Sequence, residues 1–354
     1  SHNDPANHSL SDVGLMYELN EEDQSQTVLK YNPGFTKRFI SEADALNKFC
    51  IMVRKPGLEV VNYLKHADYS APVNRYLLYG PQGCGKTMTM LYAISYCRKQ
   101  GWLIFPAFNT WSWLKYKKEI VRSQWNKERV DHSEVASRWL ENFRQINSHL
   151  LDKIYTTREY VWTKYEKSEA GISFASLVDQ GIARVRIASD VIGCIIREVL
   201  QQDDSNFPRS LVAVDCVNSF FSITTLKIEP GIYVEPNELT MVYNFKKLLR
   251  NRWKNGAVVV GLNTSGIQNQ TGRVENITSE HPHDILGPDG FDWLDPHIPI
   301  HVPLYTDIES ISQLAYYQDR KWLVGRSISE AGEAEILQIC GNSPNDISVY
   351  CGHL

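Results

Sequence analysis

The sequence contains no run of apolar residues near the roughly 18 that a membrane-spanning helix needs, so no membrane partner is expected. It also contains no C-x-x-C pair, and its seven cysteines are odd in number. Neither a disulfide framework nor a zinc site is therefore expected, and a reducing compartment fits this usage. The net charge is only −4, which argues against a protein coated in nucleic acid. The length of 354 residues, 43% of them hydrophobic, suits one large globular domain or two ordinary ones.

The start of the chain lacks basic residues. Residues 1–23 hold six acids and no Lys or Arg, and the first residue is Ser1, so we expect no basic transit peptide or signal peptide in it. Residues 1–45 are polar overall, with a turn at Asn32–Gly34. They are predicted to form an extended arm that stays loose or orders against a partner.

A phosphate-binding loop is the strongest feature that the sequence does contain. Residues 80–87 read GPQGCGKT and fit G-x-x-x-x-G-K-[ST], between a predicted strand at 75–79 and a helical pattern over 86–100. Lys86 would reach the β- and γ-phosphates, and the Thr87 hydroxyl would bind Mg²⁺. A glycine-rich turn that matches by chance is the alternative, which the correct flanks disfavour. The predicted nucleotide contacts in the loop are Gly80, Gln82, Gly83, Cys84, Gly85, Lys86, Thr87 and Met88.

Apolar patterns along the chain predict alternating strands and helices, and a β-α-β unit implies a parallel sheet. Further strands are expected at 102–105, 211–214, 257–262 and 298–305, and helices at 41–53, 56–63, 133–154, 174–202, 238–254, 310–322 and 329–340, with a short one at the end. Residues 107–205 hold no convincing strand, so they are predicted to be a helical insertion. Residues 266–296 are predicted to be a loop.

Asp215 supplies the predicted second half of the phosphate site. It directly follows the apolar strand at 211–214, as the Mg²⁺-binding aspartate of phosphate-loop enzymes does. Hydrolytic enzymes of the related ATPase class place a glutamate next, but this chain has Cys216, and a thiol is a poor base. Asn263, after the fourth strand, either faces the γ-phosphate or only ends the strand. No Arg follows Arg326, so an arginine expected near the C-terminal helices is missing too. These absences favour a nucleotide that is bound but hydrolysed slowly or not at all.

Two basic stretches are candidates for RNA contact. Residues 115–129 hold six basic residues against two acids, among several aromatic residues, and residues 246–254 hold no acid. Cationic and aromatic side chains together suit a nucleic-acid surface. A solvated helix face is the simpler explanation of each run and is favoured on sequence alone. The candidate residues are Lys115, Lys117, Lys118, Lys246, Lys247 and Arg250.

The chain resembles the death-associated protein three family of mitochondrial small-subunit ribosomal proteins over roughly residues 46–354. Two of the segments that carry the resemblance, Met52–Pro56 and Gln180–Arg186, are not generic to phosphate-loop proteins. The others are Arg75–Gly80, Gln100–Ile104, Tyr160–Trp162, Leu211–Asp215, Asp289–Asp292 and Leu294–Pro296. The arm before residue 45 matches poorly, so nothing is carried over to it.

The resemblance implies an α/β fold of the AAA-type phosphate-loop class, with a parallel five-stranded sheet. It implies a nucleotide-binding domain at 46–305, with the helical insertion at about 107–205, and a C-terminal helical lid at 306–354. It also implies bound GTP or GDP with Mg²⁺, and a base lying near Met52 and Arg54. No guanine-reading N-K-x-D segment follows Asp215, so ATP stays open.

The resemblance further implies a structural role in the head of the small subunit of the mitochondrial ribosome, in the matrix. The implied partners are small-subunit rRNA and neighbouring ribosomal proteins. Contact with the large subunit stays open, and no homo-oligomer is expected. The main alternative is an active signal-switch NTPase linked to apoptosis, which would need a glutamate or an arginine from a partner. A phosphate-loop kinase is disfavoured because no acceptor-binding signature is evident.

Overall fold

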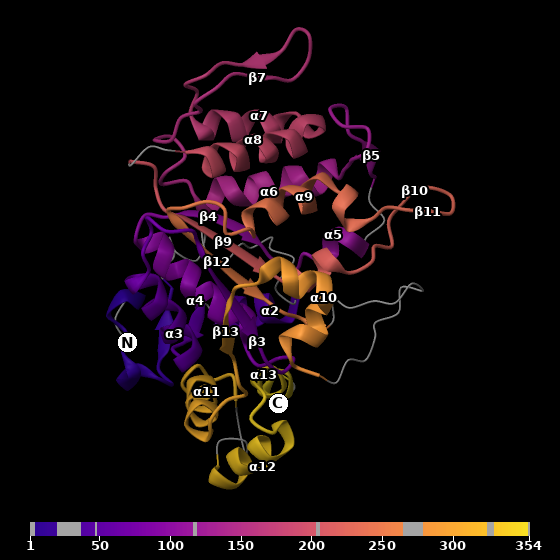
Figure 1. The fold of residues 1–354 in the computed structure, drawn as a ribbon. Helices are drawn as coiled ribbons and strands as arrows, with labels where there is room; N and C mark the ends of the chain where they lie inside the picture. The colour runs from indigo at the N-terminus through magenta and orange to yellow at the C-terminus, as the bar shows by residue number, and fades with distance from the viewer. Residues whose placement is uncertain are drawn as a thin grey trace. The chain divides into compact units, whose positions relative to one another are not determined.

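A computed structural model describes residues 4–19, 37–46, 48–115, 119–202, 206–264, 279–323 and 329–352. Its main sheet has five strands in the order β13–β3–β12–β9–β4 (Figure 1). Their bounds are Ile298–His301, Asn74–Tyr79, Gly256–Gly261, Ser210–Asp215 and Leu103–Ala107 in that order. This is the parallel α/β, AAA-type phosphate-loop arrangement that the sequence predicts, and the predicted fold class is confirmed.

The inner strands of the sheet explain why their sequences are almost continuously apolar. Every residue of β9 and of β12 is buried. β9 pairs in parallel with β12, Asp215 beside Gly261, and with β4 on its other side. Strands of parallel sheets are covered by helices on both faces, so polar residues are confined to the strand ends.

The chain divides into two compact units, and their bounds differ from the domains expected from the sequence. The first unit comprises residues 1–67, 77–96 and 299–354, and the second comprises 68–76 and 97–298. The predicted arm, phosphate loop and C-terminal lid therefore fall in one unit. Most of the remaining sheet and the helical insertion fall in the other.

The described part of the predicted arm is folded onto its own unit. It contains the short helices η1 (Pro5–Asn7) and η2 (Leu10–Asp12) and the strand β1 (Met16–Glu18). Tyr17 and Leu19 are fully buried. His8 Nδ1 lies 2.7 Å from the hydroxyl of Tyr92, and the Tyr17 hydroxyl 3.1 Å from that of Ser95, both on α4 (Lys86–Lys99). Because the segment is polar overall, its composition did not indicate that a few of its large side chains are buried in the core.

The helix predicted at 41–53 is misplaced. The helix α2 spans Lys37–Leu46, and Cys50–Met52 forms the strand β2, which pairs antiparallel with β1. The helix α3 (Lys55–His66) begins where Pro56 predicts it. A short apolar run such as 50–53 cannot be assigned to helix or strand by periodicity alone, and here the pairing partner decides.

The C-terminal helices of the first unit share a core with α2. They are α11 (Asp307–Asp319), α12 (Glu330–Cys340) and α13 (Pro344–Cys351), at the positions predicted from the sequence. Leu46 packs with Leu314 and Ile347 in this core. Glu42 of α2 accepts hydrogen bonds of 2.6 Å from the hydroxyls of Tyr317 and Ser348.

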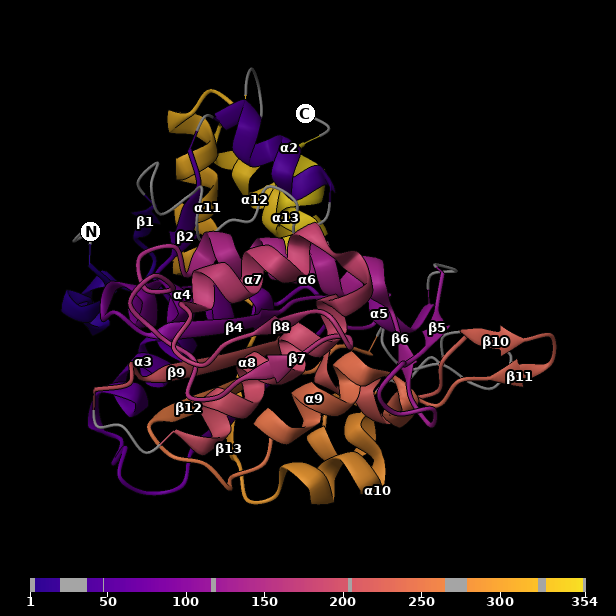
Figure 2. The same ribbon diagram turned by 90° about the horizontal axis from the view of Figure 1, so that it is seen from above.

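The helical part of the second unit is built from α6 (Ser133–Ile146), α7 (Phe174–Ala183), α8 (Ala188–Gln201) and α9 (Thr240–Leu248) (Figures 1 and 2). The helix predicted over 174–202 is interrupted by the 3-10 turn η3 (Val185–Ile187), and the one predicted over 238–254 is shorter. A Cβ on Gly181 would lie 2.5 Å from Leu140, so this glycine lets α7 and α6 approach closely.

The described residues of the second unit also form three short hairpins and several shorter helices, and two of the hairpins lie within 107–205, where no strand was predicted. The hairpins pair β5 (Val121–Arg122) with β6 (Val130–Asp131), β7 (Tyr160–Val161) with β8 (Lys167–Ser168), and β10 (Lys227–Glu229) with β11 (Ile232–Tyr233). The shorter helices are α5 (Ser112–Lys115), η4 (Val217–Phe221) and η5 (Pro236–Glu238).

The loop predicted at 266–296 is wrong over its second half. The helix α10 spans Pro282–Leu294, with Pro282 at its first turn and Asp284 following. Gly287 (φ +67°) and Pro288 kink this helix, which hides its periodicity in the sequence. Residues 265–278 lie outside the described residues. None of the described helices combines the length and the apolar composition that crossing a membrane requires.

Candidate nucleotide-binding site

The phosphate loop joins β3 to α4, and conformation requires its three glycines, two of which packing requires as well. Gly80, Gly83 and Gly85 have φ values of +140°, +79° and +101°, at which residues other than glycine are strained. A Cβ on Gly80 would lie 2.2 Å from the carbonyl oxygen of Val302, and one on Gly83 would lie 2.8 Å from Cβ of Asn345. The predicted strand–loop–helix context is therefore present.

The lysine of the loop lies over the loop itself. Lys86 Nζ donates to the carbonyl oxygens of Gly80 at 2.8 Å and Pro81 at 2.7 Å. Thr87 and Met88, the next residues of α4, are half-buried, and Gln82 is exposed. A loop of this kind offers a cation, backbone N–H groups and a hydroxyl to a bound phosphate.

Arg54 is held by protein groups on all sides, although the resemblance places it near the base. Its side chain is 7% exposed. Nη1 donates to the carbonyl oxygen of Cys84 at 2.7 Å, and Nε to Oε1 of Glu309 at 3.1 Å. Nη2 donates to the carbonyl oxygens of Pro303 and Leu304. In this structure the guanidinium holds the phosphate loop in place, a role that the sequence did not predict.

Glu309 and Tyr305 complete the surroundings of Arg54. The guanidinium carbon of Arg54 lies 4.7 Å from the centre of the Tyr305 ring. Oε2 of Glu309 accepts a 2.8 Å hydrogen bond from the Thr306 backbone N–H, which closes a capping box at the start of α11. The pattern Thr306-x-x-Glu309 is readable in the sequence as a helix cap. Its second role, as the counter-ion of Arg54, depends on a contact between distant parts of the chain.

Cys84 and Met52 are also among the buried residues predicted for this site. The Cys84 side chain is fully buried, and burial raises the pKa of its thiol. It is therefore a protonated space-filler beneath the loop. Met52, at the end of β2, is 7% exposed.

Asp215, in the second unit, ends β9 as predicted. Its Oδ1 accepts a 2.9 Å hydrogen bond from the backbone N–H of Cys216, and its carbonyl oxygen accepts one of 2.9 Å from the Thr110 hydroxyl. These contacts fix the backbone at the strand end.

Cys216 stands where a hydrolytic ATPase would have its glutamate, and it is unsuited to act as a base. It adopts a left-handed conformation with φ +62°, which is uncommon for residues other than glycine. It is 2% exposed. Burial, with the Asp215 charge as a second cause, raises the pKa of its thiol far above the usual value. The thiol therefore stays protonated at neutral pH and cannot accept a proton from water.

Asn263 follows β12, and its backbone is fixed by a second asparagine. The Asn218 side chain donates to the carbonyl oxygen of Asn263 at 2.9 Å and accepts from its backbone N–H at 3.1 Å. This pairing of a side chain with a backbone peptide sets the chain direction after the strand.

The RNA candidates differ in how accessible the structure makes them. Lys246 is buried, with Nζ 2.7 Å from Oδ1 of Asn237 and 4.2 Å from the centre of the Phe221 ring. It therefore lies on no solvated helix face. Lys247 is exposed, and Arg250 and Lys115 are half-buried, Lys115 with Nζ 3.7 Å above the Trp111 ring. Lys117 and Lys118 lie outside the described residues.

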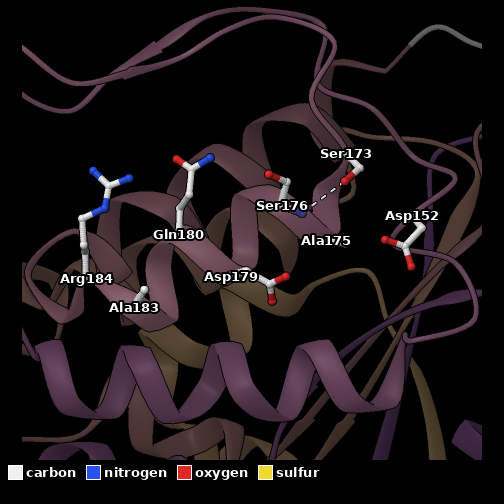
Figure 3. Close-up of a pocket in the computed structure, with 8 residues that line it drawn as sticks. All are labelled: Asp152, Ser173, Ala175, Ser176, Asp179, Gln180, Ala183 and Arg184. Atoms are coloured by element: carbon white, nitrogen blue, oxygen red, sulfur yellow. Dashed lines mark hydrogen bonds between the residues drawn. The ribbon is translucent and has the colours of Figure 1, made fainter.

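A shallow groove along α7 shows no sign of binding chemistry (Figure 3). Its polar side chains serve local structure: Ser173 caps α7, Asp179 pairs with Arg144 at 3.0 Å, and Arg184 pairs with Glu166 at 3.0 Å. The described residues also include no cluster of three or more His, Cys, Asp or Glu side chains that could hold a metal ion.

Comparison with known families decides what kind of protein this is. The model of the family described as mitochondrial ribosomal death-associated protein 3 matches residues 51–347. The chain belongs to this family. Membership confirms the resemblance seen in the sequence and the mitochondrial location that it implies.

Two curated members of the family extend the match to the whole chain. The small ribosomal subunit protein mS29 of Bos taurus is 37% identical over 354 residues, which cover 99% of this chain and 87% of that protein. Its counterpart from Mus musculus is 36% identical, covering 100% of this chain and 89% of the relative. The aligned region thus includes the residues before 45.

The solved structures that match are far more distant. The Walker-type ATPase paby2304 of Pyrococcus abyssi is 12% identical with a TM-score of 0.41, over 84% of this chain and 65% of that one. The ORC2 protein of Aeropyrum pernix, solved in ADPNP–ADP complexes, is 14% identical with a TM-score of 0.34, over 90% and 62%. This chain thus spans less than two thirds of either protein, and we base the fold on its own strand order.

Proposed function

We propose that this chain is a structural component of the small subunit of the mitochondrial ribosome that holds a guanine nucleotide in its phosphate loop. In this proposal the nucleotide is an element of the folded structure, and its hydrolysis is slow or absent. The ribosomal part is supported by the names of the curated relatives, which cover the chain almost completely. The guanine base is supported by the family resemblance.

The geometry of the phosphate loop is the observation that carries the nucleotide-binding part. Three glycines with positive φ precede α4, and Lys86 lies over the loop. Arg54 holds the loop in place by donating a hydrogen bond to the carbonyl oxygen of Cys84. A braced loop is pre-organised, so little conformational entropy is lost when a phosphate binds.

The chemistry of the loop fits a magnesium ion. Thr87, directly after Lys86, offers a hydroxyl oxygen, and Mg²⁺ prefers oxygen ligands. A bound ion would neutralise charge on the β- and γ-phosphates. Slow turnover is supported by Cys216, whose buried, protonated thiol replaces a carboxylate base.

The test is to identify what the native protein carries. The full-length protein is denatured, and the nucleotide that it releases is identified by mass spectrometry. We expect a guanine nucleotide, and we expect the Lys86→Ala variant to release much less of it. Lys127→Ala, which removes an exposed lysine of the β5–β6 hairpin, is the control. An adenine nucleotide would overturn the guanine assignment. Steady turnover at about 1 s⁻¹, the low end of typical enzymes, would overturn the structural role and favour a signal switch.

A further inference from the structure

A cluster of cations surrounds Tyr243 on the surface of the second unit. The guanidinium carbon of Arg129, from the β5–β6 hairpin, lies 3.0 Å from the centre of the Tyr243 ring. Nζ of Lys247, one turn along α9, lies 4.3 Å from it. Arg250 follows just beyond the helix, 4.1 Å from the Trp293 ring. Arg197 adds a further charge from α8, which packs against α9.

Within the part of the chain that the structure describes, these four cations form no ion pair, and the charge of Asp131 acts on Arg129 only from beyond ion-pair distance. Among the described residues, no Asp or Glu oxygen lies within 4.0 Å of a side-chain nitrogen of Arg129, Arg197, Lys247 or Arg250. Their charges act on one another and on Tyr243 instead. Partial burial, and then the charges of Arg129 and Arg197, lower the pKa of Lys247. Arg129 is the main cause that lowers the pKa of Tyr243.

Like charges held together without ion-pair partners cost folding free energy, so a protein that keeps them is expected to bind something anionic there. The β5–β6 hairpin continues the surface with exposed Arg122 and Lys127 and with Trp125, which is 59% exposed. Arginines recognise phosphate with a planar fork, and an exposed indole can stack on an unpaired base. An acidic peptide would use the cations but would gain nothing specific from the exposed Trp125.

We propose that Arg129, Arg197, Lys247 and Arg250, with Trp125 of the same hairpin as Arg129, form a binding surface for RNA through its phosphate backbone. This surface deepens the ribosomal role proposed above and rests on it. The four cations supply charge without hydrogen-bonding base edges, so the surface is expected to tolerate different sequences. Buried Lys246 takes no part in it.

The test compares two double charge reversals in the full-length protein. Lys247→Glu/Arg250→Glu removes half of the cluster. Lys153→Glu/Arg158→Glu makes the same change in charge at exposed positions of the same unit, away from α9. Binding of fluorescent poly(U) is measured against salt concentration. Each phosphate contact to a single strand contributes roughly 0.7 to the slope of log K against log salt, so the cluster variant should lose about 1.4.

We expect at least tenfold weaker binding for the cluster variant at moderate salt and near-normal binding for the control variant. Trp125→Ala should weaken binding while leaving the salt slope unchanged. Equal losses in both double variants would overturn the proposal, because general charge alone would then explain binding. Tight binding of poly-glutamate that competes with poly(U) would assign the surface to an acidic protein instead. Nucleotide content, measured on the same samples, separates this outcome from failure of the phosphate-loop proposal.

Discussion

Arg54 and Glu309 form a buried ion pair, with Nε of the arginine 3.1 Å from Oε1 of the glutamate, between positions 255 residues apart in the chain. Both side chains are less than a tenth exposed. The same guanidinium bonds the carbonyl of Cys84 in the phosphate loop. The pair therefore fastens the start of α11 to the loop, within one compact unit.

Removing Arg54 should destabilise the first unit strongly. Arg54→Ala leaves the Glu309 carboxylate buried without its cation, a change that costs about 3–5 kcal/mol. Urea unfolding measures the loss, and nucleotide content should fall with it. Lys167→Ala breaks an exposed ion pair with Glu159 and should cost far less stability, because solvent screens exposed pairs. A loss for Arg54→Ala as small as for Lys167→Ala would show that the buried pair does not brace the loop.

Gly83→Ala should be rescued in part by a second change. The new Cβ would meet Cβ of Asn345 at 2.8 Å, so Gly83→Ala/Asn345→Gly should recover the stability lost to the clash. Gly101→Ala is the matched control, because Gly101 has φ +74° with no atom within 4 Å of a Cβ. That variant should lose only the about 1–2 kcal/mol of left-handed strain. Thermal unfolding compares the variants. If the double variant were no more stable than Gly83→Ala, the contact with Asn345 would not limit this position.

Replacing the buried thiol at the end of β9 should leave nucleotide hydrolysis unchanged. Cys216→Ala removes a group whose raised pKa keeps it protonated, so no base is lost. The rate of phosphate release, with labelled GTP, is the measurement. A tenfold fall at unchanged nucleotide content would show that Cys216 takes part in the chemistry.

His149 should make stability depend on pH below neutrality. Burial, with the charges of Arg98 and Lys153, lowers its pKa from 6.5 to about 4. Protons therefore bind the unfolded chain more readily, so this contribution is complete above pH 6.5 and is lost as pH falls toward 4. His149→Gln should show a smaller loss than the wild type between pH 6.5 and 4.5. Parallel profiles would exclude this residue as the cause.

Asp190 should make the stability of the protein fall as pH rises. Burial, and then the charge of Asp131, raises its pKa from 3.8 to about 7. Its contribution is present below pH 3.8 and is lost as pH rises through 7. Asp190→Asn keeps a neutral side chain at every pH, so it should be more stable than the wild type at pH 8, with the difference shrinking toward pH 4. A difference that does not vary with pH would contradict this assignment.

Local patterns in the sequence were sufficient for the five strands of the main sheet, for most helices and for the phosphate loop. The apolar run before Asp215 and the glycines before Lys86 each carry their own signal within a few residues. Two errors have a local cause: Gly287 and Pro288 disguised α10, and the short run at 50–52 had no period to follow. The remaining features could not be predicted because they depend on contacts between residues far apart in the sequence. Nothing near Arg54 indicates Glu309, and nothing near Lys247 indicates Arg129.

Lys246 is buried, whereas its neighbour Lys247 is exposed. The basic run 246–254 reads as a single charged face, but helix geometry turns adjacent residues by about 100°, so one lysine faces the interior and the other faces solvent. Lys246 packs against Phe221 and Trp293, and burial lowers its pKa to about 8. Charge reversals aimed at RNA should therefore spare it, since they would disturb folding first.

The first unit is built from three separate stretches of chain, which the ribosome synthesises at different times. Residues 77–96, which include the phosphate loop, emerge long before residues 299–354, which complete their unit. Because Gly80 packs on Val302 and Arg54 pairs with Glu309, the loop cannot reach its braced form until those late residues have been translated. The second unit, 68–76 with 97–298, is complete earlier. The braced loop is thus one of the last parts of the newly made chain to reach its final form.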